Sequence, residues 1–146
     1  MIQTTKTLDW DKYLKTAAQV VSEGIVMLKN EHQALPLKPH EEIALFGRIQ
    51  FHYYKSGTGS GGMVNVSKVT NIVDGLQESG IKLNQELLDV YHKWDNENPF
   101  DLGDGWGKEP WSQKEMPLED SLAARAAKRC QTAIAVIGRT AGEEQD

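Results

Sequence analysis

Apolar side chains recur at three- and four-residue steps in the first part of the chain. Leu14, Val21, Ile25 and Leu28 follow this pattern, which places them on one face of a helix. We therefore predict a helix from about Asp9 to Lys29, with an aspartate as its N-terminal cap. Prolines in the connector that follows prevent the helix from continuing.

Short apolar runs predict three strands. Glu42–Phe46 (EIALF) and Ala133–Ile137 (AIAVI) show no polar alternation, which is typical of strands covered on both faces. Ile81–Leu83 is a weaker candidate. Because Ala133–Ile137 is apolar throughout, we expect it to be the central strand.

Helical patterns separate these strands. One helix is expected near Val69–Ser79, with Gly80 in the left-handed cap position, and another at Gln85–Lys93, capped by Asn84. Alternation of strands and helices predicts an α/β fold, a three-layer α/β/α sandwich with a mainly parallel sheet. In such sheets ligands bind beyond the carboxyl ends of the strands.

Residues 95–117 lose all periodicity and are rich in proline and glycine. A loop of this length in a compact domain often has a function. It contains Phe100, Trp106 and Trp111, and Trp94 lies just before it. These rings either form a platform for a sugar or anchor the loop to the domain. A further helix, Leu118–Arg129, is expected to follow, with Pro117 as its first helical residue.

Two segments leave the carboxyl ends of the predicted strands. The first contains the glycine-rich stretch 55–62 (KSGTGSGG), which includes Ser56, Gly57 and Gly59. Backbone N–H groups of such a loop can bind phosphate, but neither a P-loop nor a dinucleotide fingerprint is present. The remaining interpretations are a surface loop or a loop whose backbone approaches a sugar.

The second segment follows Ile137. Gly138 allows a turn, Arg139 offers a fork of hydrogen-bond donors, and Glu143 is expected to project over the sheet edge. A carboxyl group enclosed there by a partner surface has a raised pKa and can act as a general acid. Taken alone, Glu143 and Glu144 are equally compatible with two solvated acids.

Composition excludes several classes of protein. The 146 residues suffice for one ordinary domain, and a formal net charge of -5 argues against nucleic-acid binding. Cys130 is the only cysteine, expected to be buried, and the four histidines lack metal-ligand spacing, so no metal or cofactor is expected. Neither a signal peptide nor a membrane span is recognisable, which predicts a cytoplasmic protein without membrane partners.

Taken in order, several segments resemble the second domain of glycoside hydrolase family 3. Residues 18–37 (AQVVSEGIVMLKNEHQALPL) are similar to the segment that opens this domain, and Glu42–Gly47 resembles its first strand. Ser56–Gly62 resembles the family's "GSGSG" loop. Residues 134–143 (IAVIGRTAGE) resemble the strand and loop that contain the general acid/base in many members.

This resemblance implies a retaining β-glucosidase acting on β-linked glucosides or oligosaccharides. Glu143 matches the acid/base position, although the adjacent Glu144 leaves the assignment open, and Arg139, Ser56, Gly57 and Gly59, with Trp106 and Trp111, are expected at the sugar. The family's nucleophile is an aspartate of a TIM-barrel domain, which this chain lacks. Residues 1–146 are therefore expected to be a partial sandwich domain, inactive alone.

The alternative is a non-catalytic carbohydrate-binding or interaction module, and a nucleotide-binding protein is a third possibility.

Overall fold

The computed structural model describes residues 7–55 and 65–142. The chain divides into two compact units between Leu37 and Lys38, and each is described by itself.

The first unit contains α1, Trp10–Gly24, and a short 3-10 helix, η1, Glu31–Gln33. The Asp9 carboxylate caps α1 by accepting a hydrogen bond from the backbone N–H of Lys12 at 3.0 Å, as predicted. The helix ends at Gly24 instead of Lys29, and Ile25 is extended. Glycine costs about 1 kcal/mol in a helix, and the β-branched residues after it favour extended backbone. The helix therefore ends before the last apolar residues of the pattern.

The second unit is built on a parallel sheet with strand order β2-β1-β3. Its strands are β1, Glu42–Phe46, β2, Lys82–Leu83, and β3, Thr132–Ala135. Ile43 of β1 pairs with Leu83 on one side and with Thr132 on the other. The predicted parallel sheet is confirmed.

The central strand is β1 and not β3, so that part of the prediction was wrong. Ile43, Ala44 and Leu45 are at most 3% exposed, whereas β3 lies at the edge of the described sheet, and Ile137 beyond it is 83% exposed. An apolar strand indicates that its side chains are suited to burial. It does not indicate which segment covers them.

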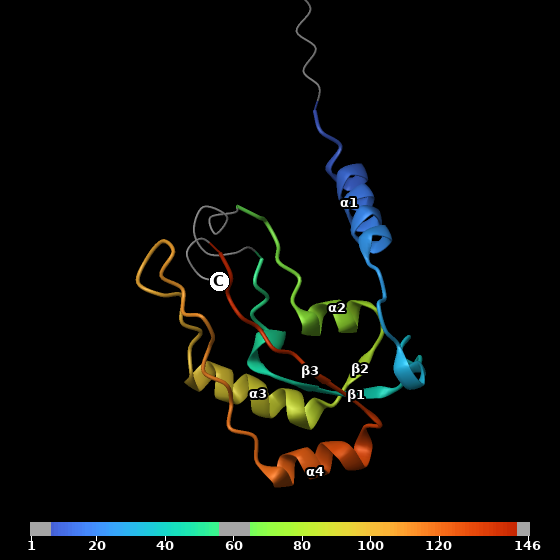
Figure 1. The fold of residues 1–146 in the computed structure, drawn as a ribbon, viewed down its shortest axis with the longest axis vertical. Coiled ribbons are helices and arrows are strands. Elements are labelled where there is room, and N and C mark those ends of the chain that lie inside the picture. The colour runs from blue at the N-terminus through green and yellow to red at the C-terminus, as the bar shows by residue number, and fades with distance from the viewer. Residues whose placement is uncertain (1–6, 56–64, 143–146) are drawn as a thin grey trace, which may run out of the picture. The chain divides into compact units, whose positions relative to one another are not determined.

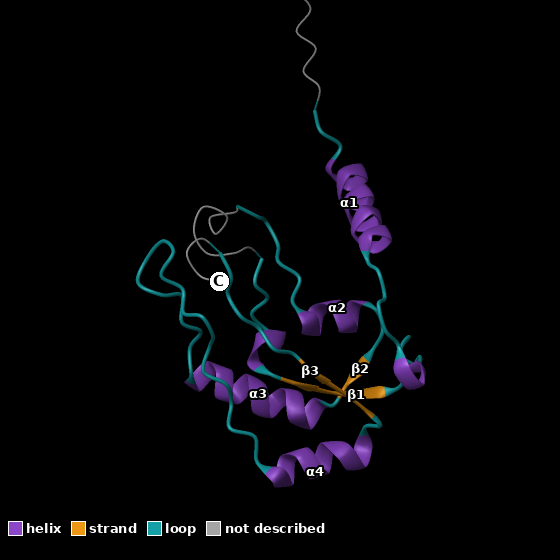
Figure 2. Cartoon of the chain, viewed as in Figure 1, coloured by secondary structure: helices purple, strands orange, loops and turns teal. Residues whose placement is uncertain are grey.

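Helices lie on both faces of this sheet (Figures 1 and 2). On one face are α3, Gln85–Glu97, and α4, Asp120–Arg129; on the other is α2, Ile72–Glu78. Ala44 faces a cluster formed with Leu87, Tyr91, Met116, Leu122, Ala126 and Cys130. Leu45 faces a second cluster with Val73 and Leu88. The three-layer α/β/α sandwich is confirmed as an incomplete domain, and Cys130 is buried as expected.

Local sequence signals predicted some helix ends correctly and others incorrectly. The Asn84 side chain caps α3 by accepting from the Leu87 N–H at 3.0 Å, and Gly80 adopts a left-handed φ of 77° after α2; both were predicted. Pro117 is not helical, because α4 begins at Asp120. The preceding Met116 is buried in the core, and the chain runs past Pro117 without regular structure before the helix starts.

Among the described residues, no helix is long and apolar enough to cross a membrane.

Candidate functional site

Two glycines bring together the segments that leave β1 and β3. Gly47 has a φ of 98°, and a Cβ there would collide with the Val136 carbonyl oxygen. A Cβ on Gly138 would lie within 2.8 Å of side-chain atoms of Ile49 and Tyr54. Only residues without a side chain permit these approaches, so the turn after β1, the 3-10 helix η2 at Arg48–Gln50, packs directly on the segment after β3.

A hollow of about 240 Å³ opens where these segments meet, at the carboxyl ends of the strands. Its apolar lining comes from Ile49, Ile72, Val136 and Ile137, and its polar groups come from Tyr53, Tyr54 and Arg139. Burial raises the pKa of the Tyr54 phenol, so its hydroxyl group stays protonated at neutral pH. The position agrees with the expectation that ligands bind beyond the carboxyl ends of a parallel sheet.

Two of the predicted sugar-binding residues lie side by side at this edge. The Arg139 guanidinium carbon lies 5.9 Å from the centre of the Trp111 ring, within the range of a cation–π interaction. The next residue, Thr140, is 4% exposed. Its backbone N–H donates to the Trp111 carbonyl at 3.0 Å, and its hydroxyl group donates to the Pro110 carbonyl at 2.7 Å.

Trp106 occupies a different part of the same loop. Its side chain is 61% exposed, and no ring contact joins it to Trp111 or Arg139 in the described part of the chain. The structure therefore brings Trp111 to the carboxyl edge and leaves Trp106 at the surface of the loop.

Trp94 and Phe100 anchor the loop, which was the alternative role considered for the aromatic set. The Arg48 guanidinium carbon lies 4.9 Å from the Trp94 ring centre and 5.7 Å from that of Phe100. Phe100 also packs on His52, with ring centres 4.7 Å apart. Trp94 and Phe100 therefore anchor the loop, whereas Trp111 lies at the carboxyl edge of the sheet.

The sequence analysis did not predict the ion-pair cluster that Arg48, Asp95 and His52 form beside these rings. Arg48 is 1% exposed, and its Nη2 contacts Asp95 Oδ1 at 2.7 Å. Asp95 Oδ2 contacts His52 Nε2 at 2.6 Å. Asp95 was expected to begin the aperiodic loop 95–117, yet it is helical. The available signal was a charged residue, Arg48, two residues after a buried strand.

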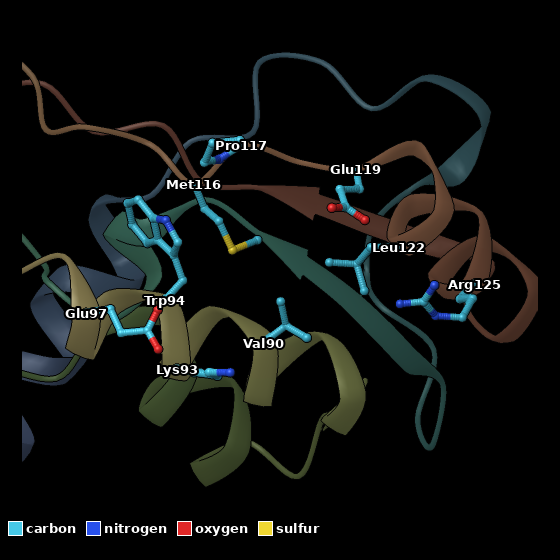
Figure 3. A pocket seen from close by; sticks show the side chains of 9 residues that line it. All are labelled: Val90, Lys93, Trp94, Glu97, Met116, Pro117, Glu119, Leu122 and Arg125. Carbon is cyan, nitrogen blue, oxygen red and sulfur yellow. The ribbon is translucent and has the colours of Figure 1, made fainter.

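A separate hollow of about 370 Å³ lies between α3 and α4 (Figure 3). Val90, Met116 and Leu122 form its floor, while charged side chains, among them Lys93 and Arg125, surround it. Of the described candidate residues, Trp94 lines this hollow, whereas Arg139, Trp106 and Trp111 do not.

Several predicted site residues lie outside the described part of the chain: Ser56, Gly57, Gly59 and Glu143. In residues 7–55 and 65–142, no three His, Cys, Asp or Glu side chains form a group that could hold a metal ion.

Comparison with known proteins places this arrangement in a family. The family described as the glycosyl hydrolase family 3 C-terminal domain matches residues 25–146. The chain belongs to this family. A β-glucosidase of Ruminococcus albus is 60% identical over 139 residues, which are 95% of this chain and 15% of that protein.

Solved structures of relatives agree. A β-glucosidase from Paenibacillus barengoltzii superposes with a TM-score of 0.85 and 48% identity, over 97% of this chain and 15% of that one. β-Glucosidase 3B from Thermotoga neapolitana, solved in complex with glucose, gives a TM-score of 0.78 and 31% identity over 94% of this chain and 19% of that one. The chain thus spans less than a fifth of the length of these relatives.

Proposed function

We propose that this chain is part of a retaining β-glucosidase and contributes its general acid/base, Glu143, but not its nucleophile. The observation that supports this most is the placement of Arg139, Thr140 and Trp111 at the carboxyl edge of the sheet. Glu143 follows Thr140 by three residues, and relatives at 48% and 60% identity are named β-glucosidases.

The nucleophile is assigned to a second domain, a TIM barrel of the same polypeptide. Retention of configuration requires two carboxyl groups about 5–5.5 Å apart. In this proposal the barrel presents an aspartate to the sugar from the side opposite the sheet edge. Glu143 then protonates the glycosidic oxygen as the glucosyl–enzyme bond forms, and later removes a proton from the attacking water.

Two of the described residues are assigned to holding the glucoside. Arg139 is exposed beside the hollow, where its guanidinium group can donate to sugar hydroxyl groups. Trp111 is 43% exposed, which leaves indole surface for the C–H face of a sugar. Tyr54 lines the hollow and precedes the glycine-rich stretch by one residue in sequence, so we propose that the backbone of Ser56, Gly57 and Gly59 approaches the sugar.

The acid/base assignment is tested by kinetics in the full-length polypeptide. Glu143→Gln should lower kcat/KM for a glucoside with a poor leaving group by about 10²–10⁴-fold, while kcat/KM for an aryl glucoside with a good leaving group, whose departure needs little protonation, should be much less affected. Glu144→Gln is the matched control and should behave like the unaltered enzyme.

Each outcome has a clear meaning. A leaving-group-dependent loss in Glu144→Gln alone moves the role by one residue. Unchanged turnover of the poor substrate in both variants refutes the proposal and favours a non-catalytic module, which calorimetry with glucose and cellobiose would then detect as binding by the chain alone.

A further inference from the structure

Thr140 is the described residue that connects the segment after β3 to the loop between α3 and α4. Its hydroxyl group and its backbone N–H donate to the neighbouring carbonyl groups of Pro110 and Trp111, at 2.7 Å and 3.0 Å. The side chain is buried, with 4% of its surface exposed. Ile137 and Arg139, which precede it, are exposed. The chain is therefore held firmly at Thr140, just beyond an exposed stretch.

The loop that receives these hydrogen bonds is itself braced. Gln113 and Asp101 join its two limbs, because the Gln113 Nε2 donates to the Asp101 carbonyl at 2.7 Å and the Asp101 N–H donates to Gln113 Oε1 at 2.9 Å. Gln113 is 8% exposed.

The base of the loop is fixed to the core by Arg48. Its Nη1 donates to the Lys114 carbonyl at 3.1 Å, and its Nη2 donates to the Asn98 carbonyl at 2.6 Å. Since Arg48 lies two residues beyond the end of the central strand and is almost fully buried, the contacts form a continuous support from β1 through the loop to Thr140.

The contacts of Thr140 matter for Glu143 because Glu143 follows Thr140 by only three residues in the sequence. Three residues span at most about 10–11 Å when fully extended, so a fixed Thr140 limits where the Glu143 backbone can lie. A general acid must be held at the glycosidic oxygen, and a misplacement of about 1 Å can reduce the rate about 10²-fold.

We propose that Thr140 is a positioning residue for Glu143: its hydroxyl bond to Pro110 sets the direction in which the acid/base segment leaves the sheet. This inference rests on the function proposed above. Thr140 has no contact with substrate in this role and acts only through the carboxyl group of Glu143.

The substitution Thr140→Val isolates the hydroxyl group, since valine keeps the β-branched shape and removes the donor to Pro110. In the full-length polypeptide, we expect kcat/KM for a glucoside with a poor leaving group to fall about ten-fold or more, with little change for an activated aryl glucoside. Thr140→Ser restores the donor and should recover most of the loss on the poor substrate.

The matched control is Thr132→Val, at the first residue of β3. The Thr132 hydroxyl group also makes a side-chain hydrogen bond, to Glu41 Oε1 at 2.6 Å. General weakening of β3 would affect both valine variants alike and both substrates alike, whereas a positioning role predicts a leaving-group-dependent loss in Thr140→Val only.

The two proposals can fail separately. If Glu143→Gln shows the leaving-group-dependent loss and Thr140→Val does not, or if Thr132→Val matches Thr140→Val, the positioning role is overturned and the acid/base role stands. If Glu143→Gln itself shows no such loss, the proposed function fails first.

Discussion

The Arg139 guanidinium carbon lies 5.9 Å from the centre of the Trp111 ring, although the two residues come from segments far apart in the sequence. Arg139 follows β3, and Trp111 belongs to the loop between α3 and α4. The contact depends on Gly47 and Gly138, which let the turn after β1 and the segment after β3 approach closely, and on Thr140, which bonds to the loop. Backbone packing thus brings together two of the residues that are proposed to bind the sugar.

Arg139 and Trp111 should act together in substrate binding. In the full-length polypeptide, a double-mutant cycle with Arg139→Ala and Trp111→Ala should give a coupling energy of about 0.5–1 kcal/mol in kcat/KM, the usual size for an exposed cation–π pair. Trp106→Ala is the control, because Trp106 has no described contact with Arg139. Additive effects for the Arg139–Trp111 pair would contradict the prediction.

Asp95 should be essential for stability. Asp95→Asn leaves the buried Arg48 guanidinium group without its counter-ion, and removing one partner of a buried ion pair costs about 3–5 kcal/mol. We expect a clearly lower midpoint of urea denaturation. Asp89→Asn is the control on the same helix, because Asp89 is exposed and bonded only to Gln85 in the described structure; that variant should unfold as the unaltered protein does. Equal midpoints for the two variants would argue against the cluster.

Gly138 should not tolerate a methyl group. Gly138→Ala would place Cβ against Ile49 and Tyr54, and overpacking of this kind costs about 1–3 kcal/mol. Since the displaced side chains line the hollow, activity should fall as well. Gly75→Ala is the control: the new Cβ would make one ordinary contact with Thr70 at 3.7 Å, and helix propensity favours alanine by about 1 kcal/mol. Denaturation of both variants checks the prediction.

Buried phenol groups predict a loss of stability at alkaline pH. Burial raises the pKa values of Tyr54 and Tyr91 above the ordinary value of 10.0. Above that pH the unfolded chain releases these protons before the folded one does. Stability contributed by the neutral phenols is therefore complete below about pH 10 and is lost as the pH rises through the folded-state pKa values.

Tyr91→Phe tests this sign directly. The variant lacks one of the two phenols whose pKa is raised by burial, so its stability should decline less steeply above pH 10 than that of the unaltered protein. A steeper slope in Tyr91→Phe would contradict the assignment.

Local signals predicted most of the elements. The apolar run of β1, the Asn84 cap and the left-handed Gly80 each depend on neighbours in sequence, and each was found as expected. The Arg48–Asp95–His52 cluster could not be predicted, since it joins residues from the turn after β1 and the last turn of α3. The same limit applies to β3, whose edge position depends on which strands pair with it.

Only part of the candidate site could be predicted, because its geometry also depends on contacts between residues far apart in the sequence. The parallel sheet and the carboxyl-edge rule pointed to this edge of the sheet, and Arg139 and Trp111 lie there. Choosing between Trp106 and Trp111 needed the loop conformation, which hydrogen bonds from Thr140, Arg48 and Gln113 determine. The cytoplasmic location and the single-domain boundary stay predictions.

Azide rescue tests the central claim most directly. Glu143→Ala in the full-length polypeptide removes the group that activates water, so an activated aryl glucoside should form the glucosyl–enzyme and then turn over slowly. Azide needs no base, and its addition should raise turnover and give β-glucosyl azide with retained configuration. Turnover of Glu143→Ala that is as fast as in the unaltered enzyme and indifferent to azide would contradict the account.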